Sequence, residues 1–387
     1  MKQSLNNNLK LPQLTFTRFI AATAIVIYHD KGLSYPFDGL GIQNFVSFWN
    51  CMVSYFFVLS GFILVVSSFK NGFVKVDKKV FWINRFARIY PLYFFALIMY
   101  LVLSLNANHK LESLTADKFF LTSLLIQSWS PSHAMDYNGP SWSLSVEMFF
   151  YCFFPFLIIL FEKLSLSSKA LVASLVWAVS LLLYIFFIKD GYSYNFTHYF
   201  PLLHLNEFLL GMFTAYVYLS HSDIINHNKK FLLLFLTGSA CLTIYLIITH
   251  NSFIKEYYAN GLFAPLFAVM ILYLCTNTNS IRKYLGHRLA VYLGEISYGV
   301  YILQIPFSIL VYGINKRTLK LSHAWEFYIF LVGLIFFSAL CYECIEKPLR
   351  RGIRKRFAEK RTDKILKAQG VNLLENNLGQ TVEVVSK

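Results

Sequence analysis

Long apolar stretches, separated by short polar segments, recur along nearly the whole chain. Each stretch of about twenty residues is long enough to cross a hydrocarbon core of roughly 30 Å as an α-helix. The stretches are apolar all round and lack the two-residue alternation of a spanning β-strand, which argues against a closed barrel. The sequence therefore predicts an all-α polytopic membrane protein with about ten transmembrane helices. We expect them near 16–33, 46–68, 89–105, 142–161, 170–188, 199–219, 231–249, 258–276, 289–314 and 325–345.

The composition supports this prediction. The chain is 56% apolar and 14% charged, whereas soluble domains contain about 45–50% apolar and about 25% charged residues. The first apolar stretch contains Arg18 and ends in His29-Asp30 without a small-residue cleavage site. We therefore expect it to remain as a helix and not to be removed as a signal peptide.

The basic residues predict the orientation. When they are assigned to alternate sides of the ten spans, 27 of the 35 Lys and Arg fall on one side, which should be cytoplasmic, together with both termini. A basic cluster follows Glu346, so we predict a transmembrane domain at 1–346 and a basic, polar cytoplasmic tail at 347–387. Anionic lipid headgroups explain the net charge of +15 better than nucleic acid does. The few basic residues on the other side are Lys31, Lys110, Lys118, Lys189, Lys255, Lys316, Arg317 and Lys320.

Two ionisable residues lie inside the first predicted span. Such residues cost about 2.5–3.5 kcal/mol each at a helix centre on insertion scales, and so mark candidate functional sites. Arg18 and His29 are eleven residues apart, close to three helical turns and about 16 Å of rise. They should share one helix face, with Arg18 toward the cytoplasm and His29 toward the exterior. The alternative is that Arg18 reaches the headgroups and that His29 is an interfacial residue beside Asp30.

A second candidate is the arginine pair at the cytoplasmic start of the third span. Arg85 and Arg88 are three residues apart, so they should share a helical face. Guanidinium groups suit phosphates because they stay charged and donate paired hydrogen bonds. An ordinary positive-inside anchor is the alternative interpretation.

A third candidate opens the fourth span from the external side. In the segment 142–147, Ser143 and Glu147 are four residues apart and face the same way, with Ser145 between them. We expect Glu147 at about the depth of His29, where a carboxylate could orient an imidazole or bind a sugar hydroxyl. Helix capping accounts for the serines but not for a carboxylate one turn into an apolar helix.

Further polar residues occur in two later spans. They are candidates for supporting the site or binding an acceptor, although hydrogen bonding between helices is their commoner use. The segment from Phe56 to Phe62 also places small residues in mid-helix, which permits either close helix packing or a close ligand approach. The polar residues are Ser297, Tyr301, Gln304 and Ser308 in the ninth span and His204 and Glu207 in the sixth.

Metal chemistry has little support in the sequence. Cys341 and Cys344 have the spacing of a metal or redox motif, but they lie in a predicted span without a second pair of ligands. We expect no metal and no bound cofactor.

Taken together, these residues resemble the membrane-bound acyltransferase-3 family, which includes bacterial O-acetyltransferases of envelope glycans. The resemblance covers about 12–348 and depends on the order of the motifs along ten spans, because none of them is specific alone. In order, they are Arg18-x10-His29, Phe57-Val58-Leu59-Ser60-Gly61-Phe62, Arg85-x2-Arg88 with Tyr90-Pro91, Trp142 to Glu147, Ser297-Tyr298 with Tyr301, and Glu346-Lys347-Pro348.

The resemblance implies transfer of an acyl group, usually acetyl from cytoplasmic acetyl-CoA, to a hydroxyl of an extracytoplasmic or lipid-linked glycan. It also implies a multi-pass protein of the bacterial cytoplasmic (inner) membrane. In such enzymes the arginine–histidine pair and the paired arginines are the functional residues, which correspond here to Arg18, His29, Arg85 and Arg88. The chain departs from the family at Gln304, where a histidine is frequent. Some relatives also carry a soluble hydrolase-like domain; this chain shows none, so we expect transfer to finish in the membrane domain unless a partner takes the acyl group.

Our mechanistic hypothesis is that the three arginines bind the CoA phosphates. His29 then acts as general base or as acyl carrier, with Glu147 as a second catalytic residue. A secondary transporter that exports lipid-linked or acylated sugars is the main alternative, but the repeated hydropathy pattern with paired broken helices is not found. A glycosyltransferase or polymerase is a third possibility, and the short external loops argue against it.

Overall fold

The predicted helical architecture is confirmed. The computed structural model describes residues 11–30, 34–70, 72–106, 115–249, 260–276 and 279–368. Among them, eight helical segments are long and apolar enough to cross a membrane. The other two predicted spans correspond to α1, of 18 residues, and α12, of 11 residues. Residues 31–33 and 258–259 of those spans, 1–10 of the predicted domain and 369–387 of the predicted tail lie outside the described residues.

The elements follow one another in a simple order, with one short antiparallel ribbon in which Phe69 pairs with Val74 and Lys70 with Phe73. The helices before the ribbon are α1 (Pro12–His29), α2 (Leu40–Val46), η1 (Trp49–Cys51) and α3 (Met52–Ser68), and its strands are β1 (Phe69–Lys70) and β2 (Phe73–Val74). The central helices are α4 (Lys78–Asn106), α5 (Ala116–Ser123), η3 (Gln127–Trp129), η4 (Gly139–Ser141), α6 (Trp142–Lys163), α7 (Leu166–Lys189), α8 (Tyr194–Tyr199), η5 (Pro201–His204), α9 (Leu205–His227) and α10 (Lys229–Ile248). The last are α12 (Ala264–Leu274), α13 (Asn279–Leu285), α14 (Arg288–Ile314), η6 (Asn315–Leu319), α15 (His323–Cys341), η7 (Tyr342–Glu346) and α16 (Lys347–Ala368).

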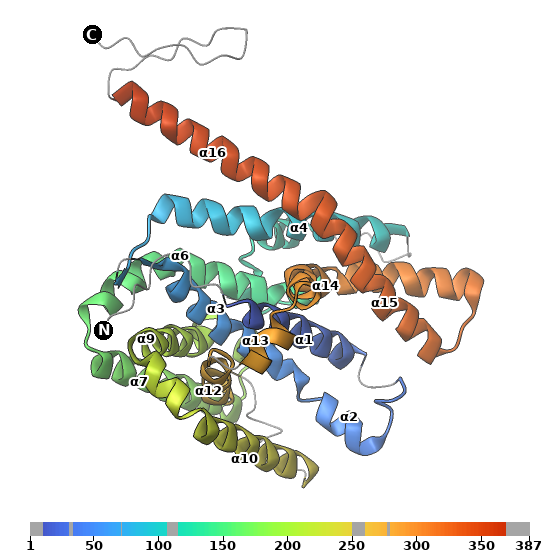
Figure 1. The fold of residues 1–387 in the computed structure, drawn as a ribbon. Coiled ribbons are helices and arrows are strands. Elements are labelled where there is room, and N and C mark those ends of the chain that lie inside the picture. The colour runs from blue at the N-terminus through green and yellow to red at the C-terminus, as the bar shows by residue number, and fades with distance from the viewer. Residues whose placement is uncertain are drawn as a thin grey trace.

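The centre of the bundle is formed by α1, α3 and α14, with α4 on one side and α10 on the other (Figure 1). The helices α1 and α14 pack closely, because Gly294 has no side chain: a Cβ there would lie 2.0 Å from the carbonyl oxygen of Thr15. Further along, His29 contacts Gln304. The later residue of α1 contacts the later residue of α14, so the two helices run in the same direction. This is expected for the first and ninth spans.

The helices α3 and α9 form a second close pair. A Cβ on Gly61 would lie 2.1 Å from the carbonyl oxygen of Phe208, and one on Gly211 would lie 2.0 Å from that of Val58. Small residues at such crossings let two helix backbones approach closely. The sequence left open whether Gly61 serves packing or ligand approach, and this contact assigns it to packing.

This packing gives a stability prediction with a matched control. We expect Gly61→Ala to lower the unfolding midpoint in detergent clearly, because relieving the clash requires a backbone shift, and overpacking costs about 1–3 kcal/mol. Gly238→Ala in α10 should leave the midpoint unchanged or raise it slightly, since a Cβ at that position would have no atom within 4 Å. Thermal unfolding of both purified variants checks this, and equal midpoints would show that α3 and α9 do not pack so closely.

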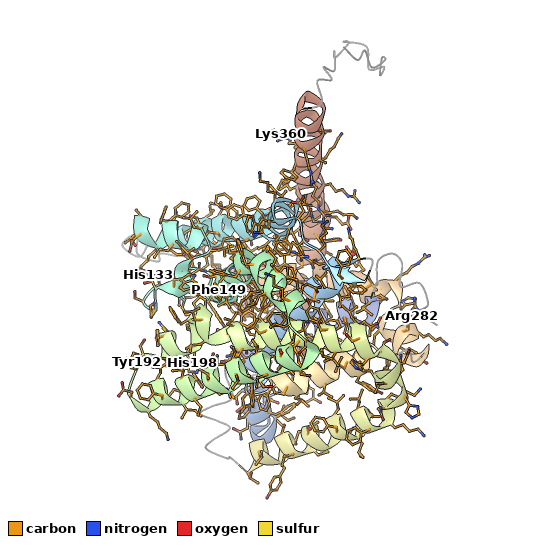
Figure 2. All side chains as sticks on the ribbon, turned by 90° about the vertical axis from the view of Figure 1, so that its left-hand side faces the viewer. His133, Phe149, Tyr192, His198, Arg282 and Lys360 are labelled. Atoms are coloured by element: carbon orange, nitrogen blue, oxygen red, sulfur yellow. The ribbon has the colours of Figure 1, made fainter. Side chains whose placement is uncertain are left out.

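The basic helix α16 leaves the bundle beside the start of α4. It continues α15 through the π-helical turn η7, and its outer part, with Lys360, projects away from the body (Figure 2). Arg354 donates to the Asn84 side chain at 2.6 Å, and Arg361 forms a 3.0 Å ion pair with Asp77. The basic tail and the basic start of α4 therefore lie at the same end of the molecule, as the predicted orientation requires.

Candidate active site

Four cavities lie along α3, from its first turn to Leu64. The outer cavity has about 320 Å³ of empty volume, the central cavity about 410 Å³, the arginine cavity about 570 Å³ and the inner cavity about 640 Å³. Each shares lining residues with the next, so the four adjoin. Val53 joins the outer and central cavities; Arg18, Phe56, Glu147 and Tyr298 join the central and arginine cavities; Arg18, Leu59, Ile63 and Arg88 join the arginine and inner cavities.

The structure brings three of the predicted residues together in the arginine cavity. Arg18 of α1 and Arg85 and Arg88 of α4 all line it. Among the described residues, none of the three guanidinium groups forms an ion pair within 4.0 Å, and the buried Nε of Arg85 has no hydrogen-bond partner. A half-buried arginine without an ion pair has lost part of its hydration without gaining a charged hydrogen-bond partner, which costs free energy. The cavity is therefore a candidate site for an anion.

Glu147 is the one carboxylate of this cavity among the described residues. It interacts electrostatically with Arg18, Arg88 and Arg85, and accepts a 3.2 Å hydrogen bond from the Tyr151 hydroxyl. One negative charge faces three positive ones, so the arginine cavity keeps a net positive charge.

The prediction that Glu147 lies at the depth of His29 is wrong. Glu147 lines the central and arginine cavities with Arg18, while His29 lines none of the four cavities. The cause is the buried start of α6. Asn138, just before it, is fully buried and donates from Nδ2 to the carbonyl of Ile302 in α14 at 2.8 Å. The helix thus begins inside the bundle, and its second turn reaches Arg18.

His29 is held by Gln304 at the exposed end of α1. Its Nδ1 lies 2.7 Å from Oε1 of Gln304, whose Nε2 donates to the carbonyl of Tyr301 at 2.7 Å. The second bond fixes the direction of the amide, so Oε1 faces the imidazole and Nδ1 must carry the proton. The lone pair of neutral His29 is therefore on Nε2. Gln304 takes the position where a family histidine was expected, and it orients His29.

The central cavity extends from Arg18 along α14 as far as Tyr301. Tyr301 lines it, and Gln304 follows one helical turn later on α14. The hydroxyl of Tyr301 is 2.8 Å from the Ser143 hydroxyl and donates to the carbonyl of Pro140 at 3.0 Å. Arg18 and His29 thus both face α14, as the eleven-residue spacing predicted.

Other predicted residues have structural contacts instead. Asp30 forms a 3.4 Å ion pair with His323. Ser145 accepts a hydrogen bond from the backbone N–H of Ser128, and Ser308 donates to a carbonyl of its own helix. None of the three lines one of the four cavities.

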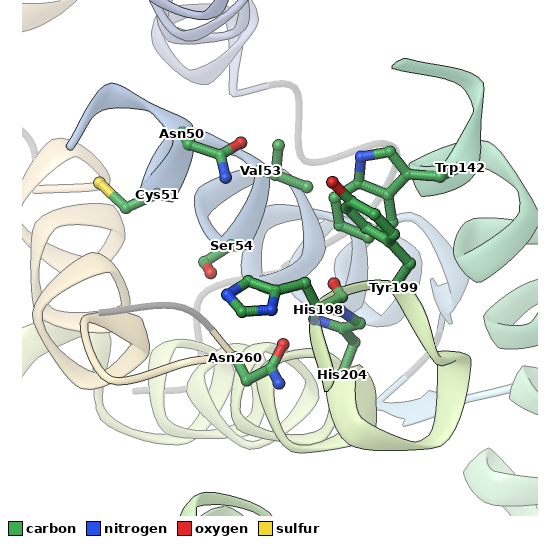
Figure 3. A pocket seen from close by; sticks show the side chains of 9 residues that line it. All are labelled: Asn50, Cys51, Val53, Ser54, Trp142, His198, Tyr199, His204 and Asn260. Atoms are coloured by element: carbon green, nitrogen blue, oxygen red, sulfur yellow. Dashed lines mark hydrogen bonds between the residues drawn. The ribbon is translucent and has the colours of Figure 1, made fainter. Parts of the chain in front are cut away.

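His204 and Glu207 form a buried pair at the outer cavity. Nδ1 of His204 lies 2.9 Å from the Glu207 carboxylate, and Nε2 lies 3.0 Å from the carbonyl of His198. The His204 side chain lines the outer cavity with His198 and Trp142 (Figure 3).

Several cavity residues received no role from the sequence. Tyr298 lines the central and arginine cavities, and Tyr151 contacts Glu147. In the inner cavity Glu346 accepts from Arg350 at 3.2 Å. The helical spacing of four between Glu147 and Tyr151, and between Glu346 and Arg350, was the available signal.

Comparison with known proteins identifies the family. The family model described as an acyltransferase domain, Acyl_transf_3, matches residues 11–343. The chain is 24% identical to the peptidoglycan O-acetyltransferase OatA of Listeria monocytogenes over 91% of its own length and 58% of that protein. It is 24% identical to the O-acetyltransferase OatA of Staphylococcus aureus over 90% and 58%. It is 34% identical to the acyltransferase MdmB of Streptomyces mycarofaciens over 38% and 39%.

The chain therefore spans little more than half the length of the two OatA proteins. No solved structure matches. The match of the family model over most of the chain carries the identification. This multi-pass membrane protein belongs to the acyltransferase-3 family.

Proposed function

We propose that this protein transfers an acyl group, most simply acetyl, from cytoplasmic acyl-CoA to a hydroxyl of an extracytoplasmic or lipid-linked glycan in the bacterial cytoplasmic membrane. The observation that carries the proposal is the cavity with three arginines that lack ion pairs among the described residues, which adjoins the central cavity. CoA can supply the anionic partners that these arginines lack, because its phosphates accept paired hydrogen bonds from guanidinium groups.

The donor would bind with its phosphates toward α4 and its thioester toward α14. The arginine and inner cavities hold Arg18 and Arg88 in common, which gives the phosphates positive charge at the end predicted to be cytoplasmic. The central cavity, lined by Phe56, Phe57 and Leu144, offers apolar walls to the uncharged arm. The acyl carbon then approaches His29 past Tyr301.

The chemical step uses the free Nε2 of His29. As general base, Nε2 takes the proton of the acceptor hydroxyl while that oxygen attacks the thioester carbonyl; the C–S bond breaks and the proton passes from the imidazolium to the CoA thiolate. In the covalent variant, Nε2 itself attacks the thioester, the C–S bond breaks and CoA leaves as the thiolate; the acceptor hydroxyl then attacks the acyl-imidazole, the C–N bond breaks, and the hydroxyl proton neutralises the thiolate. Both variants need the tautomer that Gln304 imposes.

Gln304 offers a test of that orientation. We expect Gln304→Leu to lower kcat about tenfold to hundredfold, a part of the 10²–10⁴ that a positioned base contributes. Gln304→Glu should restore much of the rate, because its carboxylate can accept from Nδ1. Initial rates with saturating substrates measure this, and Ser308→Ala is the control, because Ser308 bonds only within the same helix. Equal rates for Gln304→Leu and Ser308→Ala would contradict the orienting role.

The decisive experiment separates the enzyme from a transporter. Protein in nanodiscs is given acetyl-CoA labelled in the acetyl group, and both released CoA and label on a glycan acceptor are followed. CoA release that depends on protein and His29 supports the acyltransferase. Proton-coupled sugar uptake into proteoliposomes without any CoA release would overturn it.

A further inference from the structure

We propose that Glu346 makes the inner cavity select the nucleotide end of the acyl donor over simpler polyanions, and this inference rests on the proposed function. Glu346 belongs to the segment Glu346-Lys347-Pro348, to which the mechanism above gives no role. The class of ligand that it would select carries both phosphate groups and N–H or O–H hydrogen-bond donors.

The inner cavity is the largest of the four cavities along α3. Water-sized spheres can occupy about 210 Å³ of it, against about 20, 40 and 80 Å³ of the outer, central and arginine cavities. One water needs about 10–15 Å³ on this measure, so the inner cavity has room for a ligand many times larger. Glu295 lines it and is an exposed residue near the start of α14. The cavity therefore reaches the molecular surface near the end predicted to be cytoplasmic.

The lining of the inner cavity contains charges of both signs. It holds three guanidinium groups, from Arg18, Arg88 and Arg350, and two carboxylates, from Glu295 and Glu346. Guanidinium groups fit a phosphate, whereas a carboxylate beside them repels one. Repulsive groups of this kind contribute to specificity because they disfavour the wrong ligand. The lining therefore suits a ligand that offers hydrogen-bond donors in addition to negative charge.

Glu346 has one oxygen that is buried and unpaired. The residue is 2% exposed, and its Oε1 accepts a 3.2 Å hydrogen bond from Arg350. Its Oε2 is buried and has no hydrogen-bond partner among the described residues. Buried polar atoms nearly always have a partner in proteins, and the oxygens of an ionised carboxylate only accept. A ligand that donates an N–H or O–H to Oε2 would satisfy it.

The neighbouring charged groups already have partners. The Tyr342 hydroxyl donates to Oε2 of Glu295 at 2.8 Å. Lys347 donates to the exposed Glu343 at 2.7 Å, and neither of these two residues lines the cavity. Of the two carboxylates in the inner cavity, Glu346 is therefore the one that has a buried oxygen without a donor among the described residues.

The order of the cavities places the nucleoside at Glu346. Arg18 and Arg88 line both the inner and the arginine cavity, so phosphates bound to them lie where the two cavities meet. The uncharged arm of the donor extends from there toward the central cavity, which leaves the inner cavity for the nucleoside. The adenosine part of CoA has two donors apart from its phosphates, namely the amino group of the base and the 2′-hydroxyl of the ribose. Either can donate to Oε2 of Glu346.

Binding measurements test this selectivity without catalysis. Protein in nanodiscs is titrated by calorimetry with adenosine 3′,5′-bisphosphate, which is part of the nucleotide end of CoA, and with inorganic pyrophosphate. We expect the wild type to bind the nucleotide at least about tenfold more tightly than pyrophosphate. Glu346→Gln should lower this ratio at least about tenfold. The amide oxygen stays with Arg350, so an NH₂ group replaces Oε2; it cannot accept from the nucleoside and no longer repels pyrophosphate.

Glu343→Gln is the matched control. Glu343 lies in the same π-helical turn, is exposed and does not line the cavity, so both Kd values should stay within about twofold. A purely structural role of Glu346 would weaken both ligands alike. An unchanged ratio in Glu346→Gln therefore overturns the proposal.

Altered nucleotides give a second test on the unmutated protein. The 2′-deoxy analogue of adenosine 3′,5′-bisphosphate lacks the ribose hydroxyl, and the purine riboside analogue lacks the amino group. We expect one of the two to bind the wild type at least about tenfold more weakly than the parent nucleotide, and to lose nothing further in Glu346→Gln. Equal affinities of all three nucleotides for the wild type would contradict a hydrogen bond from the nucleoside to Glu346.

The outcome is separable from that of the proposed function. If the function holds, Glu346→Gln raises the KM for acetyl-CoA at least about tenfold and leaves that for S-acetyl-pantetheine, which has no nucleotide, within about twofold. If no variant releases CoA while Glu346→Gln still changes the ratio of nucleotide to pyrophosphate binding, the nucleotide site remains and the acyltransferase proposal fails.

Discussion

Replacement of His29 by Ala is expected to lower kcat for acyl transfer at least about a hundredfold. A positioned general base contributes about 10²–10⁴, and in the covalent variant the loss is complete because the acyl carrier is gone. The KM for acetyl-CoA should change little, since His29 lines none of the four cavities and contacts Gln304, one helical turn beyond Tyr301. Single-turnover transfer of labelled acetyl to the acceptor, with the amount of membrane-inserted protein matched, measures this.

His227→Ala is the control, because His227 is exposed at the end of α9. It should retain full activity. Acid-quenched wild-type protein, analysed by mass spectrometry, also separates the two chemical variants: an acetylated His29 peptide indicates the covalent one. Full retained activity of His29→Ala would contradict both.

Neutralising the arginine pair is expected to have the second-largest effect. We expect Arg88→Gln to raise the KM for acetyl-CoA at least about tenfold, and Arg85→Gln with Arg88→Gln about a hundredfold or more, because hydrogen bonds to charged groups contribute about 1.5–3 kcal/mol. Arg88 lines both the arginine and the inner cavity, so it should have the larger effect of the two. Steady-state kinetics at fixed ionic strength measure this.

A donor without phosphates is the control for this prediction. S-acetyl-pantetheine has the thioester but no phosphate, so the wild type and Arg88→Gln should use it equally well if the arginine binds phosphate. Arg356→Gln removes an exposed positive charge from α16 and should leave both donors unaffected. An equal loss with both donors would instead assign Arg88 to folding or membrane anchoring.

The fold was predictable because each span has a local signal. Hydropathy and charge determine where a helix crosses a bilayer, and these act over about twenty residues. The Arg18–His29 face was predictable for the same reason, since helical periodicity within α1 is enough to specify it. The polar stripe of α14 with Ser297, Tyr301 and Gln304 followed from the same rule.

The depth of Glu147 could not be predicted from local sequence patterns. Its depth depends on the buried turns η3 and η4 and on the bond from Asn138 to Ile302, residues 164 apart in the chain. The bond from Gln304 to His29 and the joining of three arginines from two helices are tertiary in the same way. These contacts cannot be predicted from a local sequence pattern, because they depend on how helices distant in the sequence pack together.

The close contact between Thr15 and Gly294 has a mechanical consequence. This contact and the hydrogen bond from His29 to Gln304 join α1 to α14 at two points, so we expect Arg18, His29 and Gln304 to move together. We therefore expect any movement that admits the donor to occur in α3, α4 or α6, which provide the other walls of the arginine cavity. The distance between Arg18 and His29 would then stay the same while the other walls of the cavity move. A donor could react only if its length from the phosphates to the thioester matched that distance.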